Sequence, residues 1–506
     1  MSGETNDAVA VPQFPNVLGQ PKPLWMLFMT EFWERFCFYG MRWMLTLYVV
    51  AQFFGGDASG EATANSTYGA YLALVYATSI LGGFAADRIL GYQRAVMLGA
   101  VVIAIGLFML MLPSETMFKV ALSVIVVGNG LFKPNISSMV GGLYRIDDNR
   151  RDRGFTIFYM GINAGAFFAP LITGYLAAKY GYIDTNPAAL KAEGFRAGFV
   201  TAGFGMLISL LWFWFGRRQL QGVGAPPKGK EGPQGLIMVL AGVLAMVPIM
   251  YFMLSHAPWL TWVLGTMFVA CCVMLITEGL KDGKVQRDRV FALLILFVFN
   301  VLFWMFFEQA GSSFNFLAEK IVNRDMFGGE FQVGWFQSVN PAAIVIFAPI
   351  ITLAWTFLDR LGKEPSIPRK FALGLIGNAF GFLVLIYALK NLVEPSSNMI
   401  PFWTLALCYV FQTLGELCLS PIGLSMVTKL APLKMVGATM GAWFLSISIG
   451  NNLAGQLAAT MSSGESGMTV DSALSGFNFS FLMLISAGVL LFLIAPLVNK
   501  LMHGVK

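Results

Sequence analysis

The stretch GNGLFKPNISSMV, residues 128–140, has a counterpart in GELCLSPIGLSMV, residues 415–427. The two align without gaps: each begins with glycine, has proline at its seventh position and ends in Ser-Met-Val. In the same order, ADRILG (86–91) resembles LDRLG (358–362), and each Asp-Arg pair follows the second predicted helix of its half. Repeated motifs in a constant order indicate two parallel halves of six helices each.

The composition indicates that these helices cross a membrane. Of 506 residues, 57% are hydrophobic and 12% are charged, against about a quarter charged in soluble domains. Stretches of about 20 apolar residues match a hydrocarbon core roughly 30 Å thick. We predict an all-α polytopic membrane protein with fourteen helices, over residues 24–53, 66–86, 95–112, 117–140, 155–178, 197–216, 235–254, 259–279, 290–310, 333–358, 370–390, 399–430, 436–461 and 475–499.

The basic residues predict the orientation of the chain. With an even number of crossings both termini share one side, and that side holds 23 of the 33 lysines and arginines. The positive-inside rule therefore places both termini in the cytoplasm. Since these residues are spread over short loops, the net charge of +6 does not indicate nucleic-acid binding. No basic residue precedes Lys22, so we expect no cleavable signal peptide.

The repeat and the helix count divide the chain into five segments. We expect a cytoplasmic tail over 1–23, a six-helix bundle over 24–216, a cytoplasmic linker with two additional transmembrane helices over 217–289, a second six-helix bundle over 290–499 and a cytoplasmic tail over 500–506. The linker begins with LQGVGAPPKGKEGPQG (220–235), which is rich in Gly, Pro and Lys. This arrangement resembles the major facilitator superfamily, as does the loop GGFAADRILGYQR (82–94).

Seven ionisable residues fall within the predicted helices, although a charge at the bilayer centre costs about 2.5–3.5 kcal/mol. Such residues occur where they face a wet cavity and pair with one another. The alternative is that they form ion pairs that only fix helix packing. Four are acidic and three are basic, so one bound proton makes the set neutral, as expected of a proton-coupling device. They are Glu31, Glu34, Arg35, Arg42, Lys133, Glu308 and Glu416.

The placement of these charges predicts the kind of substrate. Residues 31, 34, 35, 38 and 42 share one face of a helix, which we expect to point inward. Arg42 and Lys133 belong to the first half, while Glu308 and Glu416 belong to the second. A cavity between the halves would have one positive and one negative wall and would suit a zwitterion a few residues long.

Several motifs resemble those of the proton-coupled oligopeptide transporter (POT) family. EFWERFCFYGMR (31–42) is similar to its E-x-x-E-R-F signature, and further motifs follow in order: GNGLFKPN, FYMGINAGAFFAPLITG, WMFFEQAGSSF, SVNP and FQTLGELCLSPIGLS. The two additional helices resemble bacterial members, which reside in the cell inner membrane. The resemblance implies symport of di- and tripeptides with protons by alternating access. It implies no enzyme activity, no metal, no cofactor besides the proton gradient and no obligatory protein partner.

The resemblance also implies roles for individual residues. Those expected to couple protons are Glu31, Glu34, Arg35, Lys133 and Glu308, the last two as a pair. Arg42 and Lys133 would face the peptide carboxylate, and Glu416 would face the peptide amino group. The other residues expected to line the pocket are Tyr39, Tyr76, Tyr159, Asn163, Trp304, Asn340, Ser420 and Trp443.

The sequence departs from the family in two respects. Phe38 stands where the motif often has a second tyrosine. The only histidines, His256 and His503, lie outside the set of buried charges, so coupling would rest on carboxylates. Two other functions stay open. A related carrier could move nitrate, an amino acid or another metabolite, and unrelated dipeptides would then not compete. A membrane receptor would not accumulate any solute.

Overall fold

The computed structural model describes residues 12–145, 148–182, 188–227, 229–326 and 328–505. Residues 1–11 of the expected N-terminal tail, and Lys228 and Lys506 from the count of basic residues, lie outside these ranges. Twelve helices of the described chain are long and apolar enough to cross a membrane. Two further crossings, at residues 22–53 and 436–461, complete the expected fourteen. They fall short of that apolar composition because the first carries charges and the second carries amides.

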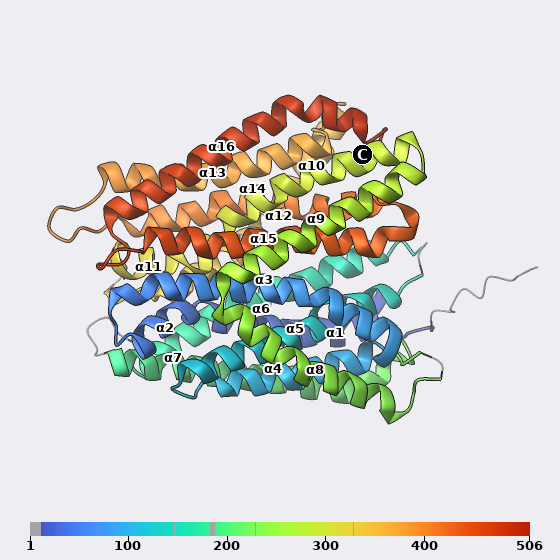
Figure 1. Cartoon of the computed structure of the whole chain (residues 1–506), viewed down its shortest axis with the longest axis horizontal. Coiled ribbons are helices and arrows are strands. Elements are labelled where there is room, and N and C mark those ends of the chain that lie inside the picture. Colours follow the sequence, from blue (N-terminus) through green and yellow to red (C-terminus); the bar gives the residue numbers. More distant parts are fainter. Residues whose placement is uncertain (1–11, 146–147, 183–187, 228, 327, 506) are drawn as a thin grey trace, which may run out of the picture.

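The first six crossings form one bundle, blue to teal in Figure 1. They are α1 (Lys22–Arg42) with α2 (Met44–Phe53), α3 (Glu61–Ala85), α4 (Tyr92–Met109), α5 (Glu115–Gly142), α6 (Arg151–Lys179) and α7 (Ala188–Gly216). Shorter elements precede α1, precede and follow α3, and follow α7: the hairpin β1 (Asn16–Val17) and β2 (Gln20–Pro21), then η1 (Ala58–Gly60), η2 (Ala86–Leu90) and η3 (Arg217–Leu220).

The last six crossings form a second bundle above the first in Figure 1. They are α10 (Lys284–Phe307) with η4 (Glu308–Gly311) and α11 (Ser313–Lys320), η5 (Val333–Ser338) with α12 (Val339–Arg360), α13 (Ile367–Asn391), α14 (Phe402–Leu430), α15 (Val436–Met461) and α16 (Val470–Leu501). A small hairpin, β3 (Asp325–Met326) and β4 (Gly329–Glu330), follows α11, and η6 (Leu433–Met435) precedes α15.

Two additional helices, α8 (Pro233–Ser255) and α9 (Ala257–Lys281), connect the bundles. α8 packs on α3 and α5 of the first bundle, and α9 packs on α10 and α15 of the second, so this hairpin spans both (Figure 1). On α9, the hydroxyl of Thr261 accepts hydrogen bonds from Asn452 (2.8 Å) and Gln456 (2.7 Å) of α15. These bonds hold α9 to the second bundle.

Both ends of the described chain lie at the same end of the molecule. Arg150, before α6, donates a hydrogen bond to Asn16 (3.0 Å), and His503 lies 2.9 Å from Asp288 at the start of α10. The starts of α1, α6 and α10 and the end of α16 therefore share one end, as an even number of crossings requires. We call this the terminal end, and the opposite end the distal end.

Two crossings are interrupted near the middle of the molecule, where the sequence predicted continuous helices over 24–53 and 290–310. The first breaks at Trp43, between α1 and α2, because the Trp43 carbonyl accepts a hydrogen bond from Asn315 of α11 (2.9 Å). The second breaks at Glu308, where α10 passes into the 3-10 turn η4. The prediction of an unbroken helix over 24–53 was wrong because the interruption depends on a contact between distant segments. The predicted helix 290–310 ends within a few residues of the break at Glu308.

The two bundles are held together toward the distal end. α3 and α15 cross at Gly69 and Gly455, where a Cβ on Gly69 would lie only 2.6 Å from the Cα of Gly455. Near the outer ends of the helices, Lys320 of α11 pairs with Glu61 of α3 at 2.8 Å. The second carboxylate oxygen of Glu61 accepts the backbone N–H of Met468 at 2.8 Å. These contacts close the distal end of the interface.

Candidate functional site

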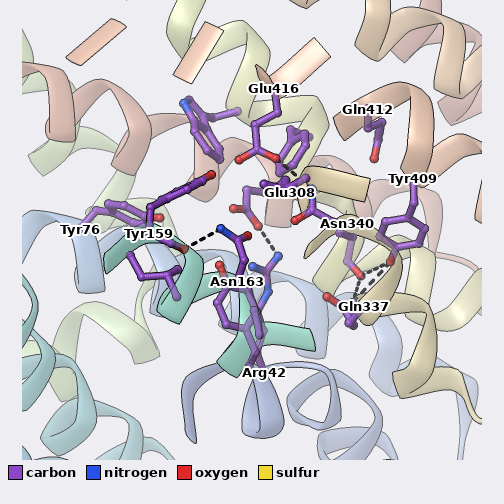
Figure 2. Close-up of a pocket in the computed structure, with 17 residues that line it drawn as sticks. Arg42, Tyr76, Tyr159, Asn163, Glu308, Gln337, Asn340, Tyr409, Gln412 and Glu416 are labelled. Carbon is purple, nitrogen blue, oxygen red and sulfur yellow. Dashed lines mark hydrogen bonds and ion pairs between the residues drawn. The ribbon is translucent and has the colours of Figure 1, made fainter. Parts of the chain in front are cut away.

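A cavity of about 140 Å³ lies between the bundles, level with the two helix breaks. Figure 2 shows side chains of both bundles pointing into it. Nine residues predicted from the sequence line it: Tyr39, Arg42, Tyr76, Tyr159, Asn163, Trp304, Glu308, Asn340 and Glu416. The structure thus brings together residues from α1, α3, α6, α10, η4, α12 and α14.

Arg42 and Glu308 form an ion pair across the cavity. The guanidinium Nη2 lies 2.5 Å from a Glu308 carboxylate oxygen, and both side chains are buried (Figure 2). Nε of Arg42 also donates a hydrogen bond to the hydroxyl of Tyr68 on α3 (2.5 Å). Each ionic partner sits at a helix break, where the backbone turns and the side chain can face the space between bundles. An ion pair in such a place is sensitive to any ligand or proton that enters the cavity.

The charged stripe of α1 lies nearer the terminal end. Arg35 binds both oxygens of Glu34 (2.5 and 2.6 Å), and its Nε lies 3.4 Å from Glu31. All three residues are at most 3% exposed, which confirms that this face points inward. Phe38 lies under the Arg35 guanidinium at 4.8 Å, so it provides a cation–π contact. The second oxygen of Glu31 is buried and has no hydrogen-bond partner.

Lys133 lies behind the cavity wall. Its Nζ is 4.1 Å from the centre of the Tyr76 ring, and Tyr76 itself lines the cavity. The expected direct pair between Lys133 and Glu308 is not formed in the described structure, because Glu308 is bound to Arg42. The Lys133 amine therefore contacts the face of a ring in the cavity wall and does not bind the Glu308 carboxylate.

Glu416 supplies the negative charge on the opposite wall. Asn340 of α12 donates hydrogen bonds to Glu416 Oε2 and to the hydroxyl of Thr413, both at 2.9 Å. These bonds orient the carboxylate toward the cavity and leave its other oxygen available to a ligand. On the first bundle, Asn163 of α6 is held by its bond to the carbonyl of Tyr159 (2.9 Å).

Besides Lys133, two residues predicted to line the pocket do not line the cavity. Trp443 is 2% exposed and packs edge-on against Phe297 and Phe371 in the core of the second bundle. Ser420 lies one turn beyond Glu416, and its hydroxyl oxygen is buried without a partner. For Trp443 the aromatic side chain serves packing in this structure, because Gly423 leaves room for its ring.

Sequence reasoning missed several uncharged residues of the site. Tyr68, Gln337, Tyr409 and Gln412 all lie at or beside the cavity. Tyr409 donates a hydrogen bond to the carbonyl of Ala310 in η4 (3.2 Å), and Gln337 bonds to the same carbonyl. Tyr409 and Gln337 therefore support the break at Glu308. A lone tyrosine or glutamine in an apolar helix carries no spacing signal, although Gln412 precedes Glu416 by one turn and shares its face.

Comparisons with known proteins agree with this architecture. A model of the POT family matches residues 93–474. The transporter YePEPT of Yersinia enterocolitica, named a peptide transporter, is 36% identical over 510 residues and 96% of each chain. The uncharacterized transporter YclF of Bacillus subtilis is 35% identical over 519 residues and the whole of each chain. A crystal structure of peptide transporter POT in complex with sulfate has a TM-score of 0.82 at 34% identity over 98% of each chain. The chain belongs to the POT family.

Proposed function

We propose that this chain is a proton-coupled symporter that imports di- and tripeptides by alternating access. The observation that carries the proposal is the cavity between the bundles, which has Arg42 on one wall and Glu416 on the other. A peptide zwitterion presents a carboxylate and an ammonium group a few bonds apart, so it matches both walls. Relatives named dipeptide and tripeptide permease, and a solved complex of peptide transporter POT with alafosfalin, support this assignment.

The ion pair gives a physical route to coupling. While Glu308 is ionised, it occupies the guanidinium of Arg42 that a peptide carboxylate would need. A proton on Glu308 removes that charge and releases Arg42, and the incoming carboxylate then replaces the lost partner. Proton and peptide therefore stabilise the same state, which is the thermodynamic requirement for symport.

The α1 stripe provides a second proton site. Glu31 and Glu34 share Arg35, so this group of three carries a net negative charge when all are ionised. The unpartnered oxygen of Glu31 is the place where a proton would be bound at least cost. Lys133 contacts the ring of Tyr76, which lines the same cavity as Glu308, so we assign to it the link between the two sites.

We further propose that the chain lies in the cell inner membrane with both termini cytoplasmic, as the distribution of lysine and arginine favours. The distal end is then extracellular, and the contacts of Glu61 keep it closed in this structure. Transport would need no cofactor or metal, because the proton gradient supplies the energy.

The test is uptake of a labelled dipeptide into liposomes that contain the pure protein. We expect accumulation above the external concentration only with an inward proton gradient, and inhibition by many unrelated dipeptides. Inhibition by nitrate or free amino acids but not by dipeptides would instead establish the alternative carrier. Binding of dipeptide without any gradient-dependent accumulation would establish the receptor.

A further inference from the structure

A second hollow lies on the outside of the first bundle, away from the transport cavity. It is a groove of about 810 Å³ between α4, α7 and α8. Apolar side chains form most of its walls, among them Val101 of α4, Leu211 and Phe215 of α7 and Leu236 of α8. Phe215 is 76% exposed and Leu211 is 53% exposed. In a membrane protein such a surface faces lipid tails, so the occupant of the groove comes from the bilayer.

At the terminal end the groove is lined by two arginines and by Glu231, whose carboxylate accepts the backbone N–H of Gly229 (3.3 Å). Arg94 lies in the first turn of α4, and Arg217 directly follows α7, so both sit where helices leave the hydrocarbon region. Arg217 is held against the Trp214 ring at 4.0 Å. Arg94 donates to the backbone carbonyls of Glu231 (2.5 Å) and Gly232 (3.2 Å). Neither arginine has a carboxylate within ion-pair distance in the described ranges.

These two arginines can bind an anion. A guanidinium has five N–H donors in a fixed fork that matches a phosphate. Two donors of Arg94 are used by the backbone carbonyls. The face of Arg217 is used by the Trp214 ring, and one of its N–H groups donates to the sulfur of Met97 (3.4 Å). The remaining N–H groups of both arginines are available to a ligand. Both arginines lie near the ends of apolar helices long enough to cross a membrane, where headgroups would lie. The apolar part of the groove continues from them along α4 and α7.

We propose that this groove binds one anionic phospholipid, with its phosphate on Arg94 and Arg217 and an acyl chain between α4, α7 and α8. The site joins three parts of the chain: the bundle through α4 and α7, the connecting segment through the Arg94 contacts, and the additional helix α8. The bound lipid fills the wedge between α8 and the bundle, and so fixes α8 against the first half.

The test is native mass spectrometry of the full chain in detergent, titrated with phosphatidylglycerol or with phosphatidylcholine of the same chain length. We expect one retained phosphatidylglycerol per protein and weaker retention of phosphatidylcholine. Arg217→Gln should weaken phosphatidylglycerol retention about fivefold, because one cation near an anionic headgroup contributes about a fivefold change in affinity. The matched control is Arg218→Gln, which removes the same charge one residue away, from an exposed side chain outside the groove.

A second variant tests the apolar part. Val101→Trp places a large ring in the groove from a membrane-facing position and should displace both lipids while leaving the arginines in place. Equal losses in Arg217→Gln and Arg218→Gln would overturn the proposal, since they would indicate a diffuse positive surface. Equal retention of both lipids by the unaltered protein, or displacement of phosphatidylglycerol by soluble glycerol phosphate at equal concentration, would also overturn it. A mass of two copies that falls to one copy in Val101→Trp would assign the groove to a protein interface instead.

Discussion

Arg42 and Glu308 meet across the two bundles at 2.5 Å, and each ends the regular helix of its own crossing. The pair therefore joins the helix breaks of the two halves that must move in alternating access. The pair separates when Glu308 binds a proton or when Arg42 binds a carboxylate. Either event acts on both helix breaks at once.

Glu308→Gln should remove the pH dependence of transport. The glutamine mimics a permanently protonated Glu308, so Arg42 stays free and dipeptide binding should survive within a few-fold. Proton-driven uptake should lose its dependence on external pH and fall at least tenfold. The measurement is uptake of a labelled dipeptide across a series of pH values. A suitable control is Glu278→Gln, which removes a carboxylate paired with Lys281 on the surface of α9. An unchanged pH profile in Glu308→Gln would contradict the role of the pair.

Glu34→Gln should separate proton movement from peptide movement. Glu34 is the closest acceptor for Arg35, and its loss leaves the stripe with one positive and one negative charge, so no further proton is needed for neutrality. We expect gradient-driven accumulation to drop to background while exchange of internal for external peptide, which moves no net proton, continues. The exchange assay also shows that the variant is folded. Full accumulation by the variant would refute the coupling role of Glu34.

Glu61 should control the closed state of the distal end. It is 2% exposed, pairs with Lys320 and accepts the N–H of Met468. Glu61→Lys places two cations together and leaves that N–H without an acceptor, a loss of about 1–3 kcal/mol. The population closed at this end should fall roughly five- to hundredfold relative to the open one. Spin-label distances across the distal end measure this shift. The double variant Glu61→Lys/Lys320→Glu should recover part of the closed population; if it behaves like the single variant, the ion pair is not what closes the end.

The sequence predicted the number of crossings and the two halves because both depend on local signals. Runs of apolar residues fix each crossing, and the repeat around Pro134 and Pro421 marks equivalent helices. The charges of the site could be found for the same reason, since Glu416 within an apolar helix has few explanations other than a polar cavity.

The sequence could not predict which charges pair. The sequence paired Glu308 with Lys133, whereas Arg42 binds Glu308 in the structure; the partner depends on the depth of each side chain in the assembled bundles. The break at Trp43 requires Asn315, which is 272 positions away in the chain. Tyr68 was missed because a tyrosine on an apolar helix looks the same whether it packs or binds Arg42. Trp443 was assigned to the pocket by mistake, because a tryptophan on an apolar helix also looks the same whether it lines a pocket or packs. In the structure its ring fills space beside Gly423.

Glu416 should recognise the amino end of the peptide. Asn340 occupies one of its carboxylate oxygens, and the other is available to an ammonium group in the cavity. A charge-assisted hydrogen bond of this kind contributes about 1.5–3 kcal/mol when both groups are desolvated. An acetylated dipeptide cannot form it and should bind roughly ten- to hundredfold more weakly than the free dipeptide.

The bond between Glu416 and the peptide amino group also predicts how the effects of Glu416→Gln and of acetylation on binding combine. Glu416→Gln should weaken the free dipeptide strongly and the acetylated dipeptide little, because the acetylated ligand has already lost the interaction. The measurement is a set of four inhibition constants, for the unaltered protein and the variant with each ligand, which isolates the coupling between the two groups. Asn340→Ala is the companion variant: it removes the group that orients Glu416 and should reduce the coupling without abolishing it. If Glu416→Gln weakens the binding of both ligands equally, the carboxylate does not bind the peptide amino group. Its charge then serves helix packing or proton binding instead.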